Sequence, residues 1–153
     1  ERNTAKPIGP LKILKEWESD EKTILKKFIS DSGVVDKYPF AFIPVGYNLE
    51  FEHKFFWQRC MSNTLQPVDI LNRPFLDLKT VGVIMNRGEF KGAGLDKLTN
   101  KPQSGKNIPR LYDEKNYGEI ESYIKKETES FCEWLVKLYV KLPKLRDELL
   151  QEN

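Results

Sequence analysis

Short apolar runs alternate with amphipathic helical segments along the chain, and this order limits the folds that it can adopt. The run LKILKEW, residues 11–17, alternates apolar and polar side chains and predicts a half-buried strand. A helix is predicted over about 20–30, because Ser19 can cap it and acidic residues fill its first turn. The apolar run FAFIPVG, residues 40–46, predicts a second strand, and a helix from about Asn48 to Asn63 is expected to follow.

The second half of the chain adds one short strand and a long final helix. The segment RPFLDLK, residues 73–79, predicts the strand, whereas TVGVIMNRG, residues 80–88, fits either a strand or a helix. Tyr117 to about Leu142 is the longest helix candidate, and Pro143 should end it because proline has no amide proton to donate. A final amphipathic turn or two is predicted in LPKLRDELL, residues 142–150. Strand, helix, strand, helix, strand and then helices predict a single α/β domain over residues 1–153.

Residues 87–110 differ from the rest of the chain in being rich in Gly, Lys and Asn. This composition predicts a loop with one short helix around Gly94–Leu98. Only two acidic residues accompany its six basic ones, which are Arg87, Lys91, Lys97, Lys101, Lys106 and Arg110. The excess of positive charge fits contact with a phosphate backbone, and it equally fits a solvated surface loop.

The composition narrows the class of protein. At 153 residues the chain is long enough to build an ordinary core, and its 25 Lys and Arg nearly balance its 23 Asp and Glu. Neither disorder nor a strongly basic coat for nucleic acid is indicated. No apolar run approaches the roughly 18–20 residues of a membrane span, and two cysteines do not make a secreted disulfide framework. We therefore expect a cytoplasmic protein with no membrane partner and with cysteines that are core thiols.

Two glutamates interrupt the apolar stripes of predicted helices. In the last helix Glu127 lies within a stripe that is formed by Ile120, Tyr123, Ile124, Phe131, Leu135 and Leu138. Glu52 lies similarly between Leu49 and Phe56 in the earlier helix. A buried carboxylate is costly unless it is paired or binds a metal, and hard cations such as Mg²⁺ prefer carboxylate oxygens. Either the two acids face inward and hold a divalent cation, or each lies at the edge of its stripe in contact with solvent.

Two ordered motifs resemble those of the DnaQ-like, or DEDD, 3′–5′ exonucleases. GYNLEFEHKFFWQR is similar to the second motif of that family, and the matching residues are Gly46, Asn48, Phe51, Phe55, Phe56 and Arg59. In YGEIESYIKKETESFCEWLVKLY, Tyr123 matches the third motif, Tyr-x-x-x-Asp. Glu52 and Glu127 stand where the family has Asp, and its first motif, Asp-x-Glu, has no counterpart in the sequence. The resemblance covers about residues 11–142, and the branch it resembles most is the proofreading domain of family B DNA polymerases.

The resemblance implies a fold and a reaction. The fold is RNase H-like, a mixed sheet flanked by helices, of which this chain lacks the first strands. The activity is metal-dependent hydrolysis of terminal phosphodiesters at single-stranded 3′ ends of DNA or RNA. Glu52 and Glu127 would bind Mg²⁺ or Mn²⁺, in a two-metal site that also needs the two acids of the first motif. Tyr123 would complete the catalytic residues by orienting the attacking water.

The resemblance also implies a nucleic-acid-binding surface. Its predicted contacts are Asn48, Arg87, Lys91, Lys106 and Arg110. The aromatic residues Phe55, Phe56 and Trp57 could stack on a terminal base, but at least two of them are expected in the core. His53 follows Glu52 and is expected to face solvent, about 100° further around the helix. The alternative function is that of a degenerate RNase H-like fold that binds nucleic acid or protein without catalysis.

Overall fold

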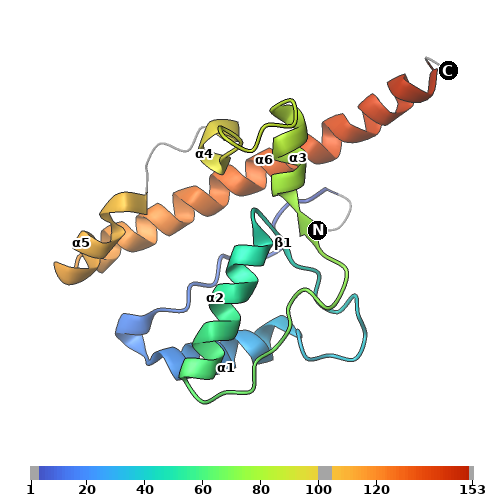
Figure 1. Ribbon diagram of the computed structural model, residues 1–153. Helices are drawn as coiled ribbons and strands as arrows, with labels where there is room; N and C mark the ends of the chain where they lie inside the picture. Colours follow the sequence, from blue (N-terminus) through green and yellow to red (C-terminus); the bar gives the residue numbers. More distant parts are fainter. Residues whose placement is uncertain (1–3, 100–104, 152–153) are drawn as a thin grey trace. The chain divides into compact units, whose positions relative to one another are not determined.

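The structure is a computed structural model that describes residues 4–99 and 105–151 of the chain. In these residues it is rich in helix and contains a small parallel sheet of two strands (Figure 1). The chain forms two compact units, Ile13–Ala93 and a second unit in which Glu1–Lys12 join Gly94–Asn153. Helices combined with a small parallel sheet agree with the predicted α/β class.

The first unit, Ile13–Ala93, holds the sheet. Its elements are η1 (Glu16–Glu18), α1 (Glu21–Ser32), β1 (Val45–Gly46), α2 (Leu49–Ser62), β2 (Leu76–Asp77) and α3 (Leu78–Met85). The strands are parallel, with Val45 opposite Leu76 and Gly46 opposite Asp77. Since β1 leads into α2 and β2 leads into α3, the N-termini of two helices lie at the carboxyl edge of the sheet.

The second unit is built on a long helix. Its described elements are α4 (Leu95–Leu98), η2 (Gly105–Asn107), α5 (Ile108–Asp113) and α6 (Tyr117–Gln151). α5 packs beside the first turns of α6 (Figure 1), where the rings of Tyr112 and Tyr117 meet edge to face at 5.8 Å. Although α6 has 35 residues, no helix within residues 4–99 and 105–151 combines the length and apolar character needed to cross a bilayer.

Two predicted strands differ from the structure. The strand at residues 11–17 is wrong, because this segment is irregular and ends in η1. An alternating pattern forms a strand only beside a partner, and in the described part of the chain the sheet consists of β1 and β2 alone. The run 40–46 is a strand only at Val45–Gly46. Pro44 has no amide proton, so it joins the ladder only through its carbonyl, which accepts from the Leu76 amide at 2.9 Å.

The helices predicted at 20–30 and 48–63 are confirmed as α1 and α2. Asp20 and not Ser19 caps α1, since the Asp20 carboxylate accepts from the Thr23 hydroxyl at 2.7 Å and from the Thr23 amide at 2.9 Å. These two bonds lower the pKa of Asp20 below its ordinary value. A carboxylate is preferred over a hydroxyl here because it also interacts favourably with the positive end of the helix dipole.

Three further segments can be compared with their predictions. The strand within 73–79 and the short helix near 94–98 are confirmed as β2 and α4. The ambiguous segment 80–88 forms most of the helix α3. The loop predicted through 105–110 is wrong, because η2 and the start of α5 lie there. Pro109 fits into the first turn of α5, where a backbone N–H would have no partner within the helix.

α6 continues past the proline that was expected to end it. Pro143 lies inside the helix, which runs to Gln151, so the predicted end near Leu142 is wrong. Proline removes a single amide donor from the helix. Apolar residues keep the same helical spacing beyond it, at Leu145 and Leu149, so the amphipathic pattern favours continuation.

Both cysteines are free thiols in helices. Burial raises the pKa of Cys60 in α2 and of Cys132 in α6 above the ordinary value of 9.0. Cys60 is fully buried and Cys132 is half-buried. The predicted core position is therefore confirmed for Cys60.

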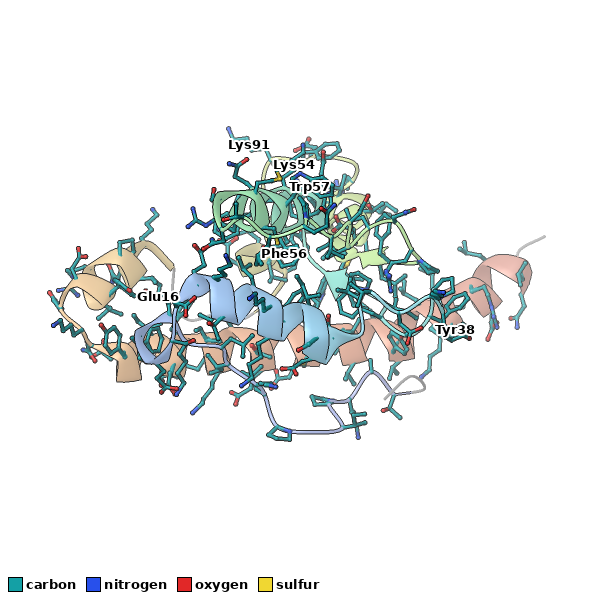
Figure 2. All side chains as sticks on the ribbon, turned by 90° about the horizontal axis from the view of Figure 1, so that it is seen from below. Glu16, Tyr38, Lys54, Phe56, Trp57 and Lys91 are labelled. Carbon is teal, nitrogen blue, oxygen red and sulfur yellow. The ribbon has the colours of Figure 1, made fainter. Side chains whose placement is uncertain are left out.

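Part of the core of the first unit lies between α1 and α2. The ring of Phe28 meets the ring of Phe56 edge to face, with centres 5.2 Å apart, and Leu25 and Leu49 are buried. Figure 2 shows Phe56 on the side of α2 that faces α1. Aromatic packing of this kind stabilises a helix pair beyond the area that it buries.

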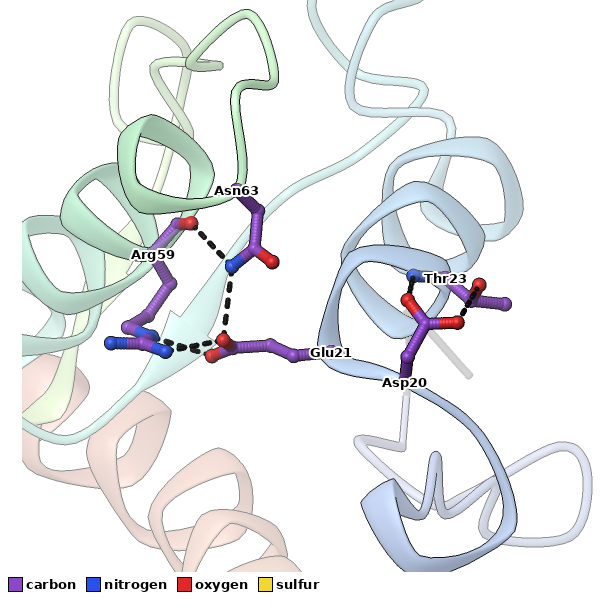
Figure 3. A network of polar contacts seen from close by, with 5 residues as sticks. All are labelled: Asp20, Glu21, Thr23, Arg59 and Asn63. Carbon is purple, nitrogen blue, oxygen red and sulfur yellow. Dashed lines mark hydrogen bonds and ion pairs between the residues drawn. The ribbon is translucent and has the colours of Figure 1, made fainter.

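A polar network also joins these two helices (Figure 3). The guanidinium of Arg59 donates to both carboxylate oxygens of Glu21, with its Nε 2.5 Å from Oε1. The side-chain amide of Asn63 donates to Glu21 at 2.9 Å and to the carbonyl of Arg59 at 3.0 Å. The bonds from Arg59 and then Asn63 lower the pKa of Glu21, and Glu21 raises the pKa of Arg59. The network therefore fixes the charged state of both partners.

Replacing Glu21 by Gln should lower the free energy of unfolding by about 1 kcal/mol at neutral pH, because a partly exposed bidentate pair contributes no more than that. The pKa of Glu21 is lower in the folded chain than its ordinary value of 4.5. Its contribution is therefore present above pH 4.5 and is lost as the pH falls through the folded value. Urea denaturation at neutral pH and near pH ~3 should show the difference from the wild type shrinking at the lower pH.

Glu18→Gln is the matched control. It removes an exposed ion pair in which Nζ of Lys15 lies 2.9 Å from Oε1 of Glu18. At neutral pH this change should lower the free energy of unfolding by less than E21Q does. If E21Q lowers the free energy of unfolding by the same amount at both pH values, the ionic role of Glu21 is contradicted.

Candidate functional site

The carboxyl edge of the sheet carries a polar cluster of three residues, which we call the strand-end cluster. It consists of Asn48 before α2, Asp77 at the end of β2, and Lys79 in the first turn of α3. Ligands of open α/β sheets bind outside the carboxyl ends of the strands. Glu52 follows one turn further along α2, so this edge is the candidate site of the first unit.

Asp77 holds the cluster together by accepting hydrogen bonds from three backbone amides. Its Oδ1 accepts from the amides of Asn48 at 2.8 Å and Lys79 at 3.0 Å, and its Oδ2 accepts from the amide of Leu49 at 2.9 Å. The first amides of a helix have no partner within the helix, and a carboxylate is well suited to them. One side chain thus caps both α2 and α3.

The turn between β1 and α2 depends on Gly46 and Asn48. A Cβ on Gly46 would lie 2.6 Å from Cδ2 of Leu49, so glycine allows this buried leucine to pack against the end of the strand. Asn48 has left-handed backbone angles, φ 67° and ψ 47°, which asparagine tolerates better than most residues. Its side chain does not cap α2, contrary to a usual role of Asn at this position, because Asp77 already does. Its Oδ1 instead accepts from Nζ of Lys79 at 2.9 Å.

Glu52 lies at the exposed edge of its stripe, which is the second of the two predicted alternatives. It nevertheless lines an apolar cavity of about 680 Å³ within the first unit. Leu49, Phe55 and Phe56 line the same cavity, since they share one face of α2 with Glu52. An exposed carboxylate therefore borders a cavity of the size that binds small ligands.

The burial of the residues around Glu52 differs from the prediction. Phe56 is half-buried against Phe28 of α1, whereas Phe55 and Trp57 have exposed fractions of 58% and 41%, so the expectation of two core aromatics is wrong. Figure 2 shows Trp57 on the side of α2 opposite to Phe56. His53 is half-buried, with its Nδ1 3.8 Å from Oδ1 of Asp69 and its ring 5.8 Å from that of Trp57. The predicted solvent orientation of His53 is wrong because the helix turns this position toward the loop that carries Asp69.

Tyr123 and Glu127 lie one turn apart on α6, in the second unit, and both are half-buried. Of the predicted stripe, Ile120 and Leu138 are buried. A Cβ on Gly105 would lie 3.1 Å from Oη of Tyr123, so this glycine lets the backbone of η2 approach the phenol. The structure thus brings Tyr123 and Glu127 together, while Glu52 belongs to the first unit.

The predicted nucleic-acid contacts also fall into two pairs. Arg87 and Lys91 are exposed in the turn after α3, where Nδ2 of the Asn86 side chain donates to the carbonyls of Glu89 and Lys91 at 2.7 and 3.0 Å. Lys106 in η2 and Arg110 in α5 are exposed in the second unit, and Arg110 lies 3.5 Å from Glu114. Lys101 lies outside the described residues.

Three carboxylates, those of Asp77, Glu52 and Glu127, are the candidate oxygen ligands for a metal ion. Asp77 is occupied by backbone donors, whereas Glu52 and Glu127 supply the oxygen ligands that hard cations prefer. No group of three or more His, Cys, Asp or Glu within residues 4–99 and 105–151 lies close enough to hold a metal ion. Each unit thus offers one of the two predicted ligands.

The chain was compared with family models, curated proteins and solved structures. No family model, curated protein or solved structure matches the chain.

The role of Asp77 was missed by the sequence interpretation, although a signal was present. Asp77 follows a short apolar run and directly precedes the helical segment LKTVGVIM, which is the usual place of an N-cap residue. Its second role, as the cap of α2 from another strand, depends on the parallel pairing of β1 and β2. No local pattern indicates that pairing.

Replacing Asp77 by Ala should lower the free energy of unfolding of the first unit by about 2 kcal/mol, because three amides lose their acceptor. Asp77→Asn keeps one oxygen acceptor, so its free energy of unfolding should lie between those of the wild type and the alanine variant. Urea denaturation followed by circular dichroism measures both. Asp69→Ala is the control, since Asp69 accepts from the Leu71 and Asn72 amides within one local turn. Equal losses in the Asp69 and Asp77 alanine variants would contradict the double-capping role.

Proposed function

We propose that the chain belongs to a metal-dependent 3′–5′ exonuclease-like domain with an RNase H-like fold, acting on single-stranded 3′ ends of DNA or RNA. The observation that carries the proposal is the position of Glu52. It follows the strand-end cluster by one turn, borders an apolar cavity, and stands where the second exonuclease motif has its acidic residue. The two ordered motifs in the sequence give the proposal its chemistry.

The cavity beside Glu52 suits the terminal nucleotide. Phe55 is three residues after Glu52 on the same wall of the cavity and is largely exposed. Stacking of a base on an aromatic ring contributes about 1–3 kcal/mol and tolerates any base. The wall therefore combines a stacking surface with an oxygen ligand.

The second unit carries the other two proposed site residues, Tyr123 and Glu127. Tyr123 and Glu127 are four residues apart on α6, which places the phenol and the carboxylate on one face of the helix. In the proposed reaction Tyr123 holds the attacking water by a hydrogen bond, and Glu127 is a metal ligand. Tyr123 also lies beside η2, the segment that carries the exposed Lys106. A substrate phosphate at Lys106 would thus lie near the proposed catalytic face.

Glu52 and Glu127 would each offer a carboxylate oxygen to Mg²⁺ or Mn²⁺, and the proposed two-metal reaction also needs the two acids of a first motif. A metal at such a site stabilises the charge that develops on the attacking and leaving oxygens. Because Glu has one methylene more than the family's Asp, the two side chains reach further from their helices than the family pattern requires. The other proposed roles of this chain's residues are to bind the nucleic-acid strand through the basic pairs and Phe55 and to orient the water through Tyr123.

A second candidate function is binding without catalysis. It is favoured by the exposure of Phe55, Trp57 and the two basic pairs, since stacking and phosphate contact need no metal. The two functions share a nucleic-acid surface and differ only in cleavage.

The Glu52→Gln, Glu127→Gln double variant should lose 3′-end cleavage by about 100-fold or more, because each change removes a charged metal ligand without changing the size of the side chain. The measurement uses the full-length gene product and a 5′-labelled single-stranded oligonucleotide, with Mg²⁺ and with Mn²⁺. The wild type should shorten the labelled strand from its 3′ end.

The matched control is Glu50→Gln with Glu129→Gln, which removes two exposed carboxylates from the same two helices. It should cleave like the wild type. Metal-dependent cleavage that survives in the E52Q, E127Q variant would reject both as ligands. Salt-sensitive binding with no cleavage in any lane would favour the second function.

The two basic pairs can be tested by their salt dependence. Arg87→Ala with Lys91→Ala, and separately Lys106→Ala with Arg110→Ala, should each weaken binding to a single-stranded oligonucleotide. Each pair should reduce the slope of log K against log salt by about 1.4, since each phosphate contact on a single strand contributes about 0.7. Fluorescence anisotropy at several salt concentrations measures this slope.

Exposed lysine pairs elsewhere provide the controls. Lys26 and Lys27 on α1, and Lys125 and Lys126 on α6, are exposed residues of the same two units. Their alanine variants should leave the slope unchanged. If they lower it as much as the predicted contacts do, the binding is a property of overall charge and not of these pairs.

A further inference from the structure

The last three turns of α6 carry an apolar seam that is exposed to solvent. Every described residue from 139 to 151 is exposed. Leu142, Leu145 and Leu149 have exposed fractions of 44%, 48% and 55%. They continue the spacing of Leu135 and Leu138 in alternating steps of three and four residues. This is the a and d pattern of a coiled coil, with Leu142 and Leu149 at a and Leu145 at d.

The residues beside the seam are charged or aromatic in a defined order. Lys141 and Glu148 occupy the g positions, and Tyr139 and Arg146 occupy the e positions. Pro143 falls at b, on the outer side of the helix, so its ring does not interrupt the seam. The helix already extends through this segment as part of α6, so little further ordering of backbone is needed for association.

We propose that this seam binds the same seam of a second copy of the chain in an antiparallel coiled coil. In that arrangement the central layers pair Leu142 with the partner's Leu145, and Leu145 with the partner's Leu142. The g positions then face each other, so that Lys141 lies beside the partner's Glu148. The e positions also face each other, and Arg146 lies beside the ring of the partner's Tyr139, which suits a cation–π contact.

Charge selects the antiparallel arrangement over the parallel one. In a parallel pair each g residue faces the e residue five positions later on the partner. Lys141 would then face the partner's Arg146, and the two like charges would repel. The antiparallel pair replaces this repulsion with two symmetrical attractions between Lys141 and Glu148. The same two residues therefore determine both the partner and its direction.

Sedimentation equilibrium of the chain, at concentrations up to the order of 100 µM, tests the proposal because a seam of this length supports weak association. The wild type should show a reversible equilibrium between monomer and dimer. Leu145→Asp, which changes an exposed residue, should be monomeric with an unchanged circular dichroism spectrum. This inference does not depend on the proposed nuclease activity.

Charge exchange tests the geometry. Lys141→Glu and Glu148→Lys should each raise the dimer dissociation constant about tenfold, because two attractive pairs become repulsive. The K141E, E148K double variant should restore the wild-type constant. Lys144→Glu at the outer c position makes the same charge change away from the seam and should have little effect.

Three outcomes would overturn the proposal. A wild type that is monomeric throughout would show that the seam does not bind a second copy, whether it is left open or covered by another part of the protein. A dimer that persists in L145D would use a different surface. A tighter dimer in K141E would indicate the parallel arrangement, since the carboxylate introduced by that change would then attract the partner's Arg146.

Discussion

The Asp77 carboxylate, which accepts hydrogen bonds from three backbone amides, is the contact on which the first unit depends. β1 and β2 have two residues each, and a ladder of that length is too short to hold two strands together by itself. Asp77 joins the end of β2 to the starts of both α2 and α3. The left-handed turn at Asn48 and the position of Glu52 one turn later both follow from this anchor.

The chemistry of the chain is divided between its two units. The first contributes an exposed acid beside an apolar cavity and one basic pair after α3. The second contributes the phenol and carboxylate of Tyr123 and Glu127 on α6, together with a basic pair in η2 and α5. Each unit therefore has one proposed metal ligand and one basic pair, and the first unit also has the apolar cavity. The proposed exonuclease chemistry requires both halves and the acids of a first motif.

Local patterns predicted the fold where the interactions are local, and failed where they are not. α1 and α2 follow from helical spacing, but the cap of α1 moved from Ser19 to Asp20 because a carboxylate fits a helix N-terminus better. The alternating residues 11–17 were misassigned because periodicity does not show whether a strand has a neighbour. The edge position of Glu52 could not be decided from its spacing, since the direction of a helix face depends on what packs against it. Pro143 was weighted too heavily against the apolar spacing that continues beyond it.

The shared acceptor at Asp77 also has a dynamic consequence. The amides of Asn48, Leu49 and Lys79 belong to different elements, yet all three are held by one side chain. When that carboxylate moves away, the three protons become accessible to water in the same event. Hydrogen exchange at these amides should then report a single cooperative opening of the sheet edge, with one free energy of opening shared by residues about thirty positions apart.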